Sequence, residues 1–589
     1  MFRSAFVVGL SVALTLGSAT GAIAADQARP GAVDLDFDPG AGFEALEDNA
    51  EVYGDVVPTG DGFLIGGRFD RYRGFEASGI ASIRTDGSFN RDFRFAVEPQ
   101  RISIGNVDVG FTNQVFAIEP IGNGQYLIGG TFADGETLKI IDRSGREDPD
   151  FEFQQPSSSN RVGFPDWGFN GYVMDIQTVR PGVFLVAGQF SRFSRVKAKG
   201  IARVILGEDR ILRLDPDFQS QLSIRDRRYG APSDPWISTI DTRRDGSILI
   251  GGFFNKYQGE KVGSIAQIAP NGELLNDFDG GARVGNRNGQ VFSILTSRNG
   301  PDLVGGSFTS FGSDSAARGL AVLDGRRVRA AAPRLVDVTD FCPQPPWDGE
   351  GMQVAPAAPI TVRKIVPTSE GGYLMTGIFD GVRNIDGTGH NSVGVSRLDS
   401  DLRADWTFMD SRGRPGGLFD VCSDGSREFG YGMTIGELDN DRIVVGGDFN
   451  TAFDVQTLSD VDAPDITMLW DTKLKETELV PRSPVFPDVK AVSEKDLVDI
   501  VFAVNGRSND ARGETWVYRQ GEIGIARTEG GPCEIVERVP FDESSPGYDT
   551  VTVQHQPRSG AGTYICARQV LATNLRELAS DFSYILIQG

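Results

Sequence analysis

The stretch Leu249-Ile250-Gly251-Gly252-Phe253-Phe254 decides the fold, because six other stretches repeat its order of residue types. The order is two apolar residues, a small residue, glycine, any residue and phenylalanine. The other copies begin at Leu64, Leu127, Leu185, Leu303, Leu374 and Val444. Seven recurrences of phenylalanine two residues after glycine, at intervals of 54 to 71 residues, indicate a structural repeat.

The surroundings of each copy are also alike. An apolar stretch and a turn such as Asn123-Gly124 precede the motif, and such turns join antiparallel strands because these residues accept positive φ. A short apolar strand such as 79–83, a second turn and an Asp-Phe pair such as Asp92-Phe93 follow. Each unit therefore reads as four short strands. The sequence predicts an all-β fold, a seven-bladed β-propeller with four-stranded antiparallel blades.

The second glycine of each motif is interpreted as structural. The glycine pair of the motif lies on the second strand of a blade, where it would let neighbouring sheets approach closely, while the phenylalanine fills the space between blades. A phosphate-binding role is disfavoured because no strand-to-helix turn follows. The seven positions are Gly67, Gly130, Gly188, Gly252, Gly306, Gly377 and Gly447.

The two ends of the repeat region predict how the ring closes. The seventh unit has an apolar strand at 466–470, but no good Asp-Phe element after it. An unassigned element of that kind, Asp34-Leu35-Asp36-Phe37, lies near the N-terminus. We expect residues 34–37 to supply the outer strand of the last blade, because an open seam would expose unpaired strand edges.

The order of these elements resembles the delta-60 repeat propeller family of bacterial exported proteins. The resemblance covers about residues 34–470, although units two, five and seven depart from the pattern in their third or fourth strand. The resemblance implies an exported β-propeller, and it implies no catalytic residues.

The chain divides into four predicted segments. Residues 1–24 have the positive start, apolar run and small-residue cleavage site of a signal peptide, so a secreted or periplasmic protein is expected. An uncleaved anchor is the alternative. Residues 25–470 form the propeller, the proline-rich stretch 471–489 is a linker, and 490–589 form a small β-sandwich-like domain. No later stretch approaches the roughly 20 apolar residues of a membrane span.

Composition restricts the function and the partners. Asp and Glu number 81 against 58 Lys and Arg, which argues against nucleic-acid binding. In an exported chain the four cysteines predict two disulfides. Cys342 and Cys422 lie in connections after adjacent blades and are expected to pair, as are Cys533 and Cys566 in the small domain.

Catalytic and metal-binding residues are scarce. The two histidines, His390 and His555, lie in different predicted domains, so neither a metal site with several histidines nor a Ser-His-Asp triad is expected. We therefore assign no catalytic residue and no cofactor. Ca²⁺ held by oxygen ligands is considered only with the hydrolase hypothesis below.

Candidate ligand-binding residues lie in the long connections between units. These are 95–113, 152–171, 219–235, 342–359 and 409–430, and in a propeller they emerge on one face. Three of them carry tryptophan beside aspartate. An aromatic ring next to a carboxylate suits contact with a sugar or peptide, although these rings could instead plug the blade junctions. The candidates are Trp167, Trp236, Trp347, Asp166, Asp234 and Asp348.

Three functions remain open from the sequence. The first is a non-enzymatic binding or scaffold module that takes a glycan, peptide or protein on its loop-rich face. The second is a hydrolase or lyase that uses carboxylates in the central channel. The third is a structural component of an envelope or matrix. Fold alone does not choose between them.

Overall fold

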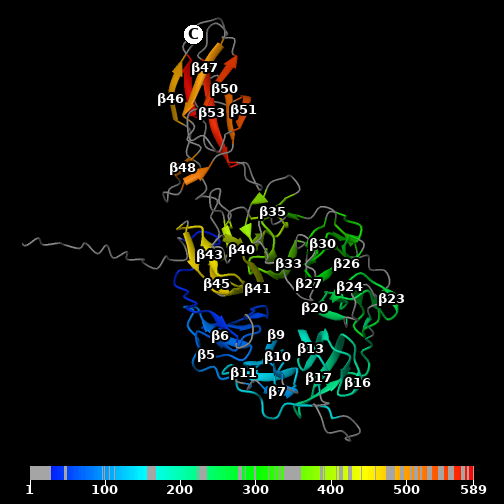
Figure 1. Cartoon of the computed structure of the whole chain (residues 1–589). Helices are drawn as coiled ribbons and strands as arrows, with labels where there is room; N and C mark the ends of the chain where they lie inside the picture. Colours follow the sequence, from blue (N-terminus) through cyan, green and yellow to red (C-terminus); the bar gives the residue numbers. More distant parts are fainter. Residues whose placement is uncertain are drawn as a thin grey trace, which may run out of the picture.

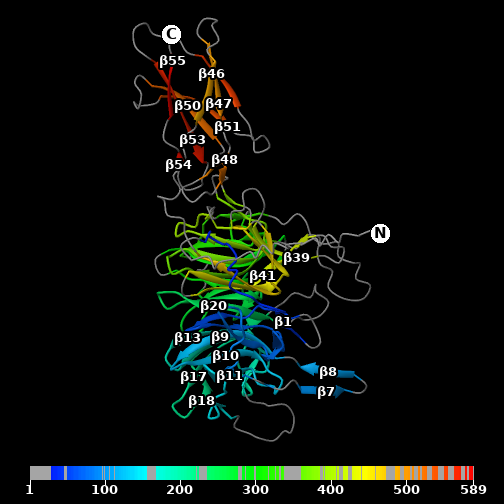
Figure 2. The same cartoon turned by 90° about the vertical axis from the view of Figure 1, so that its left-hand side faces the viewer.

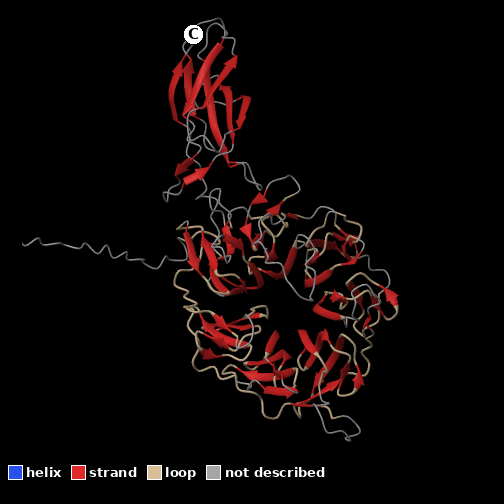
Figure 3. Ribbon diagram, viewed as in Figure 1, coloured by secondary structure: helices blue, strands red, loops and turns tan. Residues whose placement is uncertain are grey.

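The computed structural model is all-β, and the residues that it describes include no helix (Figure 3). None of them forms a helix long and apolar enough to cross a membrane. The described residues are 28–45, 50–95, 97, 100–104, 107–111, 113–155, 168–220, 222–223, 235–275, 281–285, 287–297, 300–315, 317–325, 327–329, 333–336, 360–384, 389–390, 392–405, 408–409, 416–421, 427–438, 441–457, 459–471, 485–490, 497–503, 507–509, 515–517, 520–526, 534–540, 549–554, 563–571, 578–579 and 583–587.

Each glycine motif lies on, or directly after, the middle strand of an antiparallel three-stranded core. We number these cores as repeat sheets one to seven. The first strands are β2 (Val56–Thr59), β9 (Gln114–Gly122), β13 (Tyr172–Arg180), β20 (Trp236–Thr242), β27 (Gln290–Leu295), β33 (Thr361–Pro367) and β41 (Tyr431–Leu438). The middle strands are β3 (Gly62–Gly66), β10 (Gln125–Thr131), β14 (Val183–Gln189), β21 (Ile248–Phe253), β28 (Asp302–Ser307), β34 (Tyr373–Ile378) and β42 (Arg442–Asp448). The third strands are β6 (Ile80–Arg84), β11 (Leu138–Asp142), β17 (Ile201–Leu206), β24 (Ile265–Ile268), β30 (Leu320–Asp324), β38 (Val395–Leu398) and β45 (Ile466–Trp470).

The repeat sheets pack against one another in chain order, and the seventh also contacts the first through β41 and β2. Figure 1 shows them grouped around a common centre, with β9, β13, β20, β27, β33 and β41 on the inner side. No single sheet closes on itself, although sheets five and six are joined by one residue pair, Ser307 and Thr361. The middle strands are buried almost throughout, which explains their continuous apolar sequence.

The two positions of the predicted glycine pair face different neighbours. In six repeats a Cβ atom at the second glycine would lie under 3.0 Å from the backbone carbonyl oxygen of the residue that begins the adjacent first strand, for example Trp236 beside Gly252. In the first repeat it would lie equally close to the carbonyl oxygen of Glu51, which precedes β2. The glycine thus makes room for the backbone of its own sheet. The motif phenylalanines are all buried, as expected.

The residue before that glycine faces the next repeat sheet. A Cβ atom at Gly129 or Gly305 would clash with Val173 or Val362, which lie on the first strand of the following sheet. The sixth repeat reverses this arrangement, because it has Thr376 where the others have glycine or alanine, and the facing residue is Gly432. The close approach between sheets that was predicted for the glycine pair therefore occurs at the first of its two positions.

The predicted fourth strand is mostly reduced to a turn. Among the described residues, only sheets three and five gain one, β18 (Ile211–Leu214) and β31 (Arg327–Val328), and in four other repeats a single bridge such as Ile83 to Phe89 remains. Aspartate and asparagine side chains accept hydrogen bonds from the backbone two residues on, as Asn90 does from the Asp92 N–H at 3.2 Å. These local bonds compete with strand pairing.

The N-terminal segment pairs with the last repeat sheet. Val33 forms an antiparallel bridge with Leu469 of β45, and the Asp34 N–H donates to the Met468 carbonyl at 2.8 Å. The paired residues are 31–34, so they overlap the predicted 34–37 only at Asp34. Phe37 is buried in the same apolar cluster as residues of the first repeat sheet.

The long connections are tied to short hairpins that follow the glycine motifs. β1 (Phe43–Glu44) pairs with β4 (Arg71–Tyr72), which pairs with β5 (Phe75–Glu76). The fourth repeat is built the same way, from β19 (Leu222–Ser223), β22 (Lys256–Tyr257) and β23 (Glu260–Lys261). The described parts of these connections are therefore held by strand pairing.

The C-terminal residues form two further sheets, one of strands β46, β47 and β52 and one of β50, β51, β53, β54 and β55, beside a β48–β49 hairpin. Figure 2 shows these strands apart from the repeat sheets. These strands include all or most of the apolar runs at 497–504, 515–518, 550–553, 563–566 and 582–587, from which this domain was predicted. However, β46 occupies residues that we placed in the linker. The strands are β46 (Val485–Lys490), β47 (Leu497–Ala503), β48 (Arg507–Asn509), β49 (Thr515–Val517), β50 (Gln520–Ala526), β51 (Glu534–Pro540), β52 (Asp549–Gln554), β53 (Thr563–Leu571), β54 (Leu578–Ala579) and β55 (Ser583–Ile587).

Candidate functional site

The first strands of the repeat sheets converge at the centre, and six of them contain an irregularity near their start. In β9, β13, β20, β27, β33 and β41 the register shifts by one residue there. A bulge of this kind leaves a residue unpaired and re-aims its side chain. We call the six bulge residues, with Tyr53 of the first repeat, the bulge layer. Its members, all half-buried, are Tyr53, Phe116, Met174, Ser238, Phe292, Arg363 and Met433.

Members of the bulge layer contact each other across sheet boundaries. The rings of Tyr53 and Phe116 stack with their centroids 4.9 Å apart, and Phe116 meets Tyr172 edge-on at 6.3 Å. The Arg363 guanidinium lies 4.4 Å from the centre of the Phe292 ring. Because the partners come from neighbouring sheets, these side chains gather near the common centre.

A second group, the charged layer, follows the bulge layer along the first strands and consists of Asp55, Asp175 and Lys364. Lys364 Nζ lies 2.7 Å from Asp55 Oδ1, which joins repeat sheet six to the residue before β2. The Lys364 and Asp55 side chains are 36% and 26% exposed. The corresponding residues of the other sheets are uncharged and buried. These are Ala117, Thr239, Ser293 and Thr434.

The same positions also hold neighbouring sheets together. Asp55 Oδ2 accepts a hydrogen bond from the Ile118 N–H at 3.0 Å, and Asp175 Oδ2 accepts one from the Ile240 N–H at 2.6 Å. Thr239 and Ser293 accept equivalent bonds from the next sheet. The two carboxylates thus have a structural role, and each keeps a second oxygen for other contacts.

Electrostatics distinguishes the members of the charged layer. Burial raises the pKa of Asp175 well above its usual range, and the nearby charge of Asp55 raises it further. Burial acts to lower the pKa of Lys364, but Asp55 and Asp175 outweigh it and the net shift is upward. Lys364 therefore pairs with Asp55 as a cation, while Asp175 takes up a proton more readily than an ordinary aspartate.

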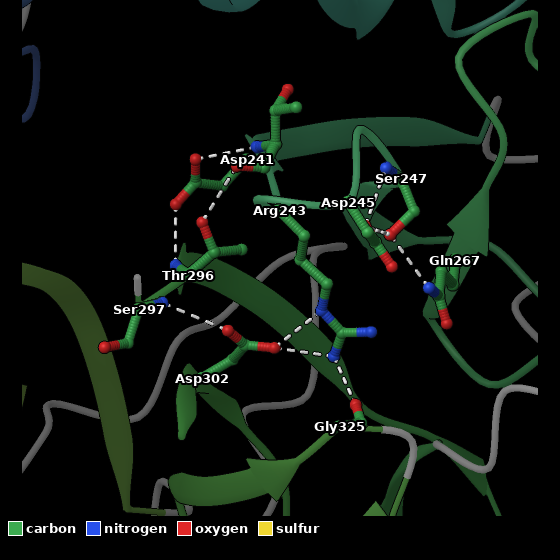
Figure 4. Close-up of polar contacts among 10 residues, drawn as sticks. Asp241, Arg243, Asp245, Ser247, Gln267, Thr296, Ser297, Asp302 and Gly325 are labelled. Carbon is green, nitrogen blue, oxygen red and sulfur yellow. Dashed lines mark hydrogen bonds and ion pairs between the residues drawn. The ribbon is translucent and has the colours of Figure 1, made fainter. Parts of the chain in front are cut away.

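Further along the first strands, polar side chains clamp one sheet to the next (Figure 4). Asp241 Oδ2 accepts from the Thr296 N–H at 2.7 Å. Arg243 pairs with Asp302 at 2.6 Å and also donates to the Gly325 carbonyl. Burial raises the pKa of Asp302, and Arg243 counteracts it. Since these groups bond one another, we assign them to packing between sheets four and five.

The predicted tryptophan site is largely untested. Trp236 is the first residue of β20, is half-buried, and its ring lies 4.9 Å from that of Phe253 on the adjacent strand. The other five candidates lie outside the described residues. They are Trp167, Trp347, Asp166, Asp234 and Asp348.

The remaining predicted positions are described only in part. Cys342, Cys422, Cys533 and His555 lie outside the described residues. Only the backbones of Cys566, on β53, and of His390, on β36 (Gly389–His390), are described. In the part of the chain that the structure describes, no group of three or more His, Cys, Asp or Glu could hold a metal ion. Both disulfides stay predictions.

The sequence contains a signal for the central residues that motif reading missed. In six repeats an apolar residue or glycine and an isoleucine flank two residues that differ from one repeat to the next. The variable pairs are Phe116-Ala117, Met174-Asp175, Ser238-Thr239, Phe292-Ser293, Arg363-Lys364 and Met433-Thr434. Equivalent positions whose residue type changes between repeats are those at which the repeat sheets do not require one particular side chain.

Comparison with known proteins gives no family. No family model matches the chain, and no curated protein matches it. Among solved structures, the tricorn protease matches with a TM-score of 0.18 and 11% identity over 90% of this chain and 47% of that one. This chain thus spans about half the length of the tricorn protease chain. A fructan 1-exohydrolase IIa from Cichorium intybus in complex with 1-kestose matches with a TM-score of 0.17 and 9% identity, covering 95% and 92%.

Proposed function

We propose that residues 25–470 form a seven-bladed β-propeller of the delta-60 type, followed by a β-sandwich-like domain. Three observations support this: seven cores carry the motif on equivalent strands, consecutive cores pack together, and the first and last cores are in contact. The contact includes Val52 against Gly446 and Val56 against Gly436. The fourth position of most blades is a turn with one bridge.

We infer that this propeller is an exported, non-enzymatic binding module, with its ligand at the centre where the long connections enter the first strands. The observation that carries this is the bulge layer. Half-buried aromatic rings of Tyr53, Phe116 and Phe292 gather there from different sheets. Aromatic faces with polar groups beneath them suit a sugar ring or an aromatic or apolar peptide side chain.

A binding assay with paired variants tests this proposal. Purified mature chain is applied to glycan and peptide arrays, and affinities are then measured for Tyr53→Ala, Phe116→Ala and Trp236→Ala. We expect the first two to weaken binding by roughly tenfold or more, as removal of a buried aromatic anchor does. Phe75→Ala, which removes a partly exposed ring outside the centre, is the control. Full affinity in both central variants, with unchanged melting, contradicts the proposed site.

A second candidate, a carboxylate-dependent hydrolase, is favoured by the charged layer. Asp175 with its raised pKa has the character of a general acid, and Asp55 is a second carboxylate in the same layer. Release of new reducing ends or amines from an array ligand, abolished by Asp175→Asn, would support hydrolysis. Turnover that is absent in wild type, or unchanged in Asp175→Asn, excludes this use of the layer.

A further inference from the structure

Arg363 is exceptional among the partly or fully buried arginines of the described residues. It is the bulge residue of β33, and its guanidinium stacks on Phe292. Its Nε atom is buried and makes no hydrogen bond. No carboxylate within the described part of the chain forms an ion pair with it. Three other arginines with little exposure all have aspartate partners. They are Arg243, Arg397 and Arg442.

The carboxylates that could neutralise Arg363 have other partners. Glu51 is paired with Arg68 at 3.2 Å, and Asp55 is paired with Lys364 at 2.7 Å. Burial lowers the pKa of Arg363, and the charges of Tyr431 and Glu51 oppose that only in part. A guanidinium remains protonated under all ordinary conditions, so the centre contains a cation with unused donors.

The surroundings of Arg363 restrict the anion that would complete it. A planar guanidinium binds carboxylate through two parallel hydrogen bonds. The Phe292 ring lies against the guanidinium, and the stacked rings of Tyr53 and Phe116 offer an apolar platform in the same layer. Asp55 and Asp175 in the adjoining layer are acceptors for hydroxyl groups. A sugar ring that bears a carboxylate combines all three features, whereas a peptide C-terminus lacks the row of hydroxyls.

We propose that Arg363 binds the carboxylate of a uronate residue in an acidic glycan, with the sugar ring against the bulge layer. This rests on the proposed binding function and names its ligand class. The chain has a net charge of −23, so its long-range field repels a polyanion. Recognition must therefore come from short-range contacts at Arg363. Moderate salt should speed association by screening the repulsion, in contrast to binding at a basic patch.

Matched acidic and neutral glycans test the proposal. Affinities of the full mature chain are measured by calorimetry for oligogalacturonate, oligomannuronate and oligoglucuronate and for the methyl ester of each. We expect at least one acid to bind tenfold or more tighter than its ester. Arg363→Gln should remove that preference, and Arg363→Lys should retain only part of it. Arg213→Gln removes the same charge from an exposed pair with Asp209 and should change nothing.

The outcomes separate this inference from the proposed function. Binding of the esters as tightly as the acids overturns the role of Arg363 but supports a glycan-binding centre. Binding only of peptides that end in a free carboxylate overturns the uronate. No binding of any acid overturns the inference, and so does an acid preference that survives in folded Arg363→Gln. Loss of binding in Phe116→Ala together with an unchanged acid preference in Arg363→Gln also counts against it.

Discussion

The middle and the first strands of the repeat sheets follow opposite rules. Middle strands are nearly interchangeable: each presents apolar residues, a small residue and a glycine to equivalent neighbours. First strands keep only their flanking positions and differ at the two residues between them. The comparison shows which positions of the repeat can vary in residue type. Seven similar packing interfaces require similar residues, whereas side chains that meet at one centre need not be alike.

The junction between sheets six and seven shows how strict the packing rule is. Elsewhere a glycine or alanine faces a valine or isoleucine of the next sheet, but here Thr376 faces Gly432. The larger side chain therefore lies on the opposite side of this interface, and the combined volume of the two side chains stays similar. Thr376 also donates to the Gly394 carbonyl at 2.6 Å, which satisfies its buried hydroxyl.

The largest effect should come from breaking the rule of the middle strands. In Gly252→Val the new Cβ would collide with the Trp236 carbonyl, and backbone cannot move aside as a flexible side chain does. We expect the free energy of unfolding to fall by roughly 2–4 kcal/mol. Denaturant titration measures it. Gly60→Val, where a Cβ meets nothing within 4 Å, is the control and should stay within about 0.5 kcal/mol. Equal effects at both sites would contradict this role.

A smaller and reversible effect is expected at the sixth junction. Gly432→Val should destabilise the protein by about 1–3 kcal/mol, because its side chain would overlap Thr376. Thr376→Gly in the same chain recreates the arrangement of the other junctions and should recover most of the loss. A double-mutant cycle on unfolding free energies measures the coupling. Additive losses would show that the two residues do not compensate each other.

In the charged layer, Asp175→Asn should affect stability in a way that depends on pH. Burial raises the folded pKa of Asp175, so the folded state holds its proton more tightly than the unfolded state. The wild-type free energy of unfolding therefore falls as pH rises from about 4 through that raised pKa. Asp175→Asn removes this term and should be more stable relative to wild type at pH 7 than at pH 4.

Melting curves of Asp175→Asn and wild type between pH 4 and 8 measure the effect, with Asp55→Asn as the matched variant. Asp55→Asn leaves Lys364 without its carboxylate and should lower stability at neutral pH by about 1 kcal/mol. Identical pH profiles for wild type and Asp175→Asn would contradict the assignment.

The smallest effect on stability should be at Arg363. Arg363→Gln loses a cation–π contact of about 0.5–1 kcal/mol and also removes a partly buried charge without a partner, and the two changes oppose each other. We expect a net change within about 0.5 kcal/mol by denaturant titration. A loss above about 1.5 kcal/mol would show that Arg363 is needed for packing, as the residues of the middle strands are.

Much of the fold was predictable, because the repeat copies a local pattern seven times. The all-β class, the positions of the seven middle strands and the strand runs of the C-terminal segment follow from turns and apolar periodicity. The fourth strand was predicted wrongly: in the first repeat the Asp92-Phe93 element was expected to pair as a strand, but only the Ile83–Phe89 bridge forms, and the Asn90 side chain accepts a hydrogen bond from the Asp92 N–H. The central residues were not predicted from the sequence, because the prediction used residue types that recur in every repeat. Tyr53, Arg363 and Asp175 do not recur.

The sequence by itself determined that seven similar β units follow one another, since backbone preferences and apolar alternation act over a few neighbouring residues. It also required a glycine at each motif, although it did not say which atom that glycine avoids. Tertiary packing alone sets Lys364 beside Asp55, 309 residues away in the chain, and Arg363 against Phe292 with no carboxylate partner among the described residues. The physical reason is that packing between sheets sets the spacing at the centre, and no local pattern encodes which side chains meet there.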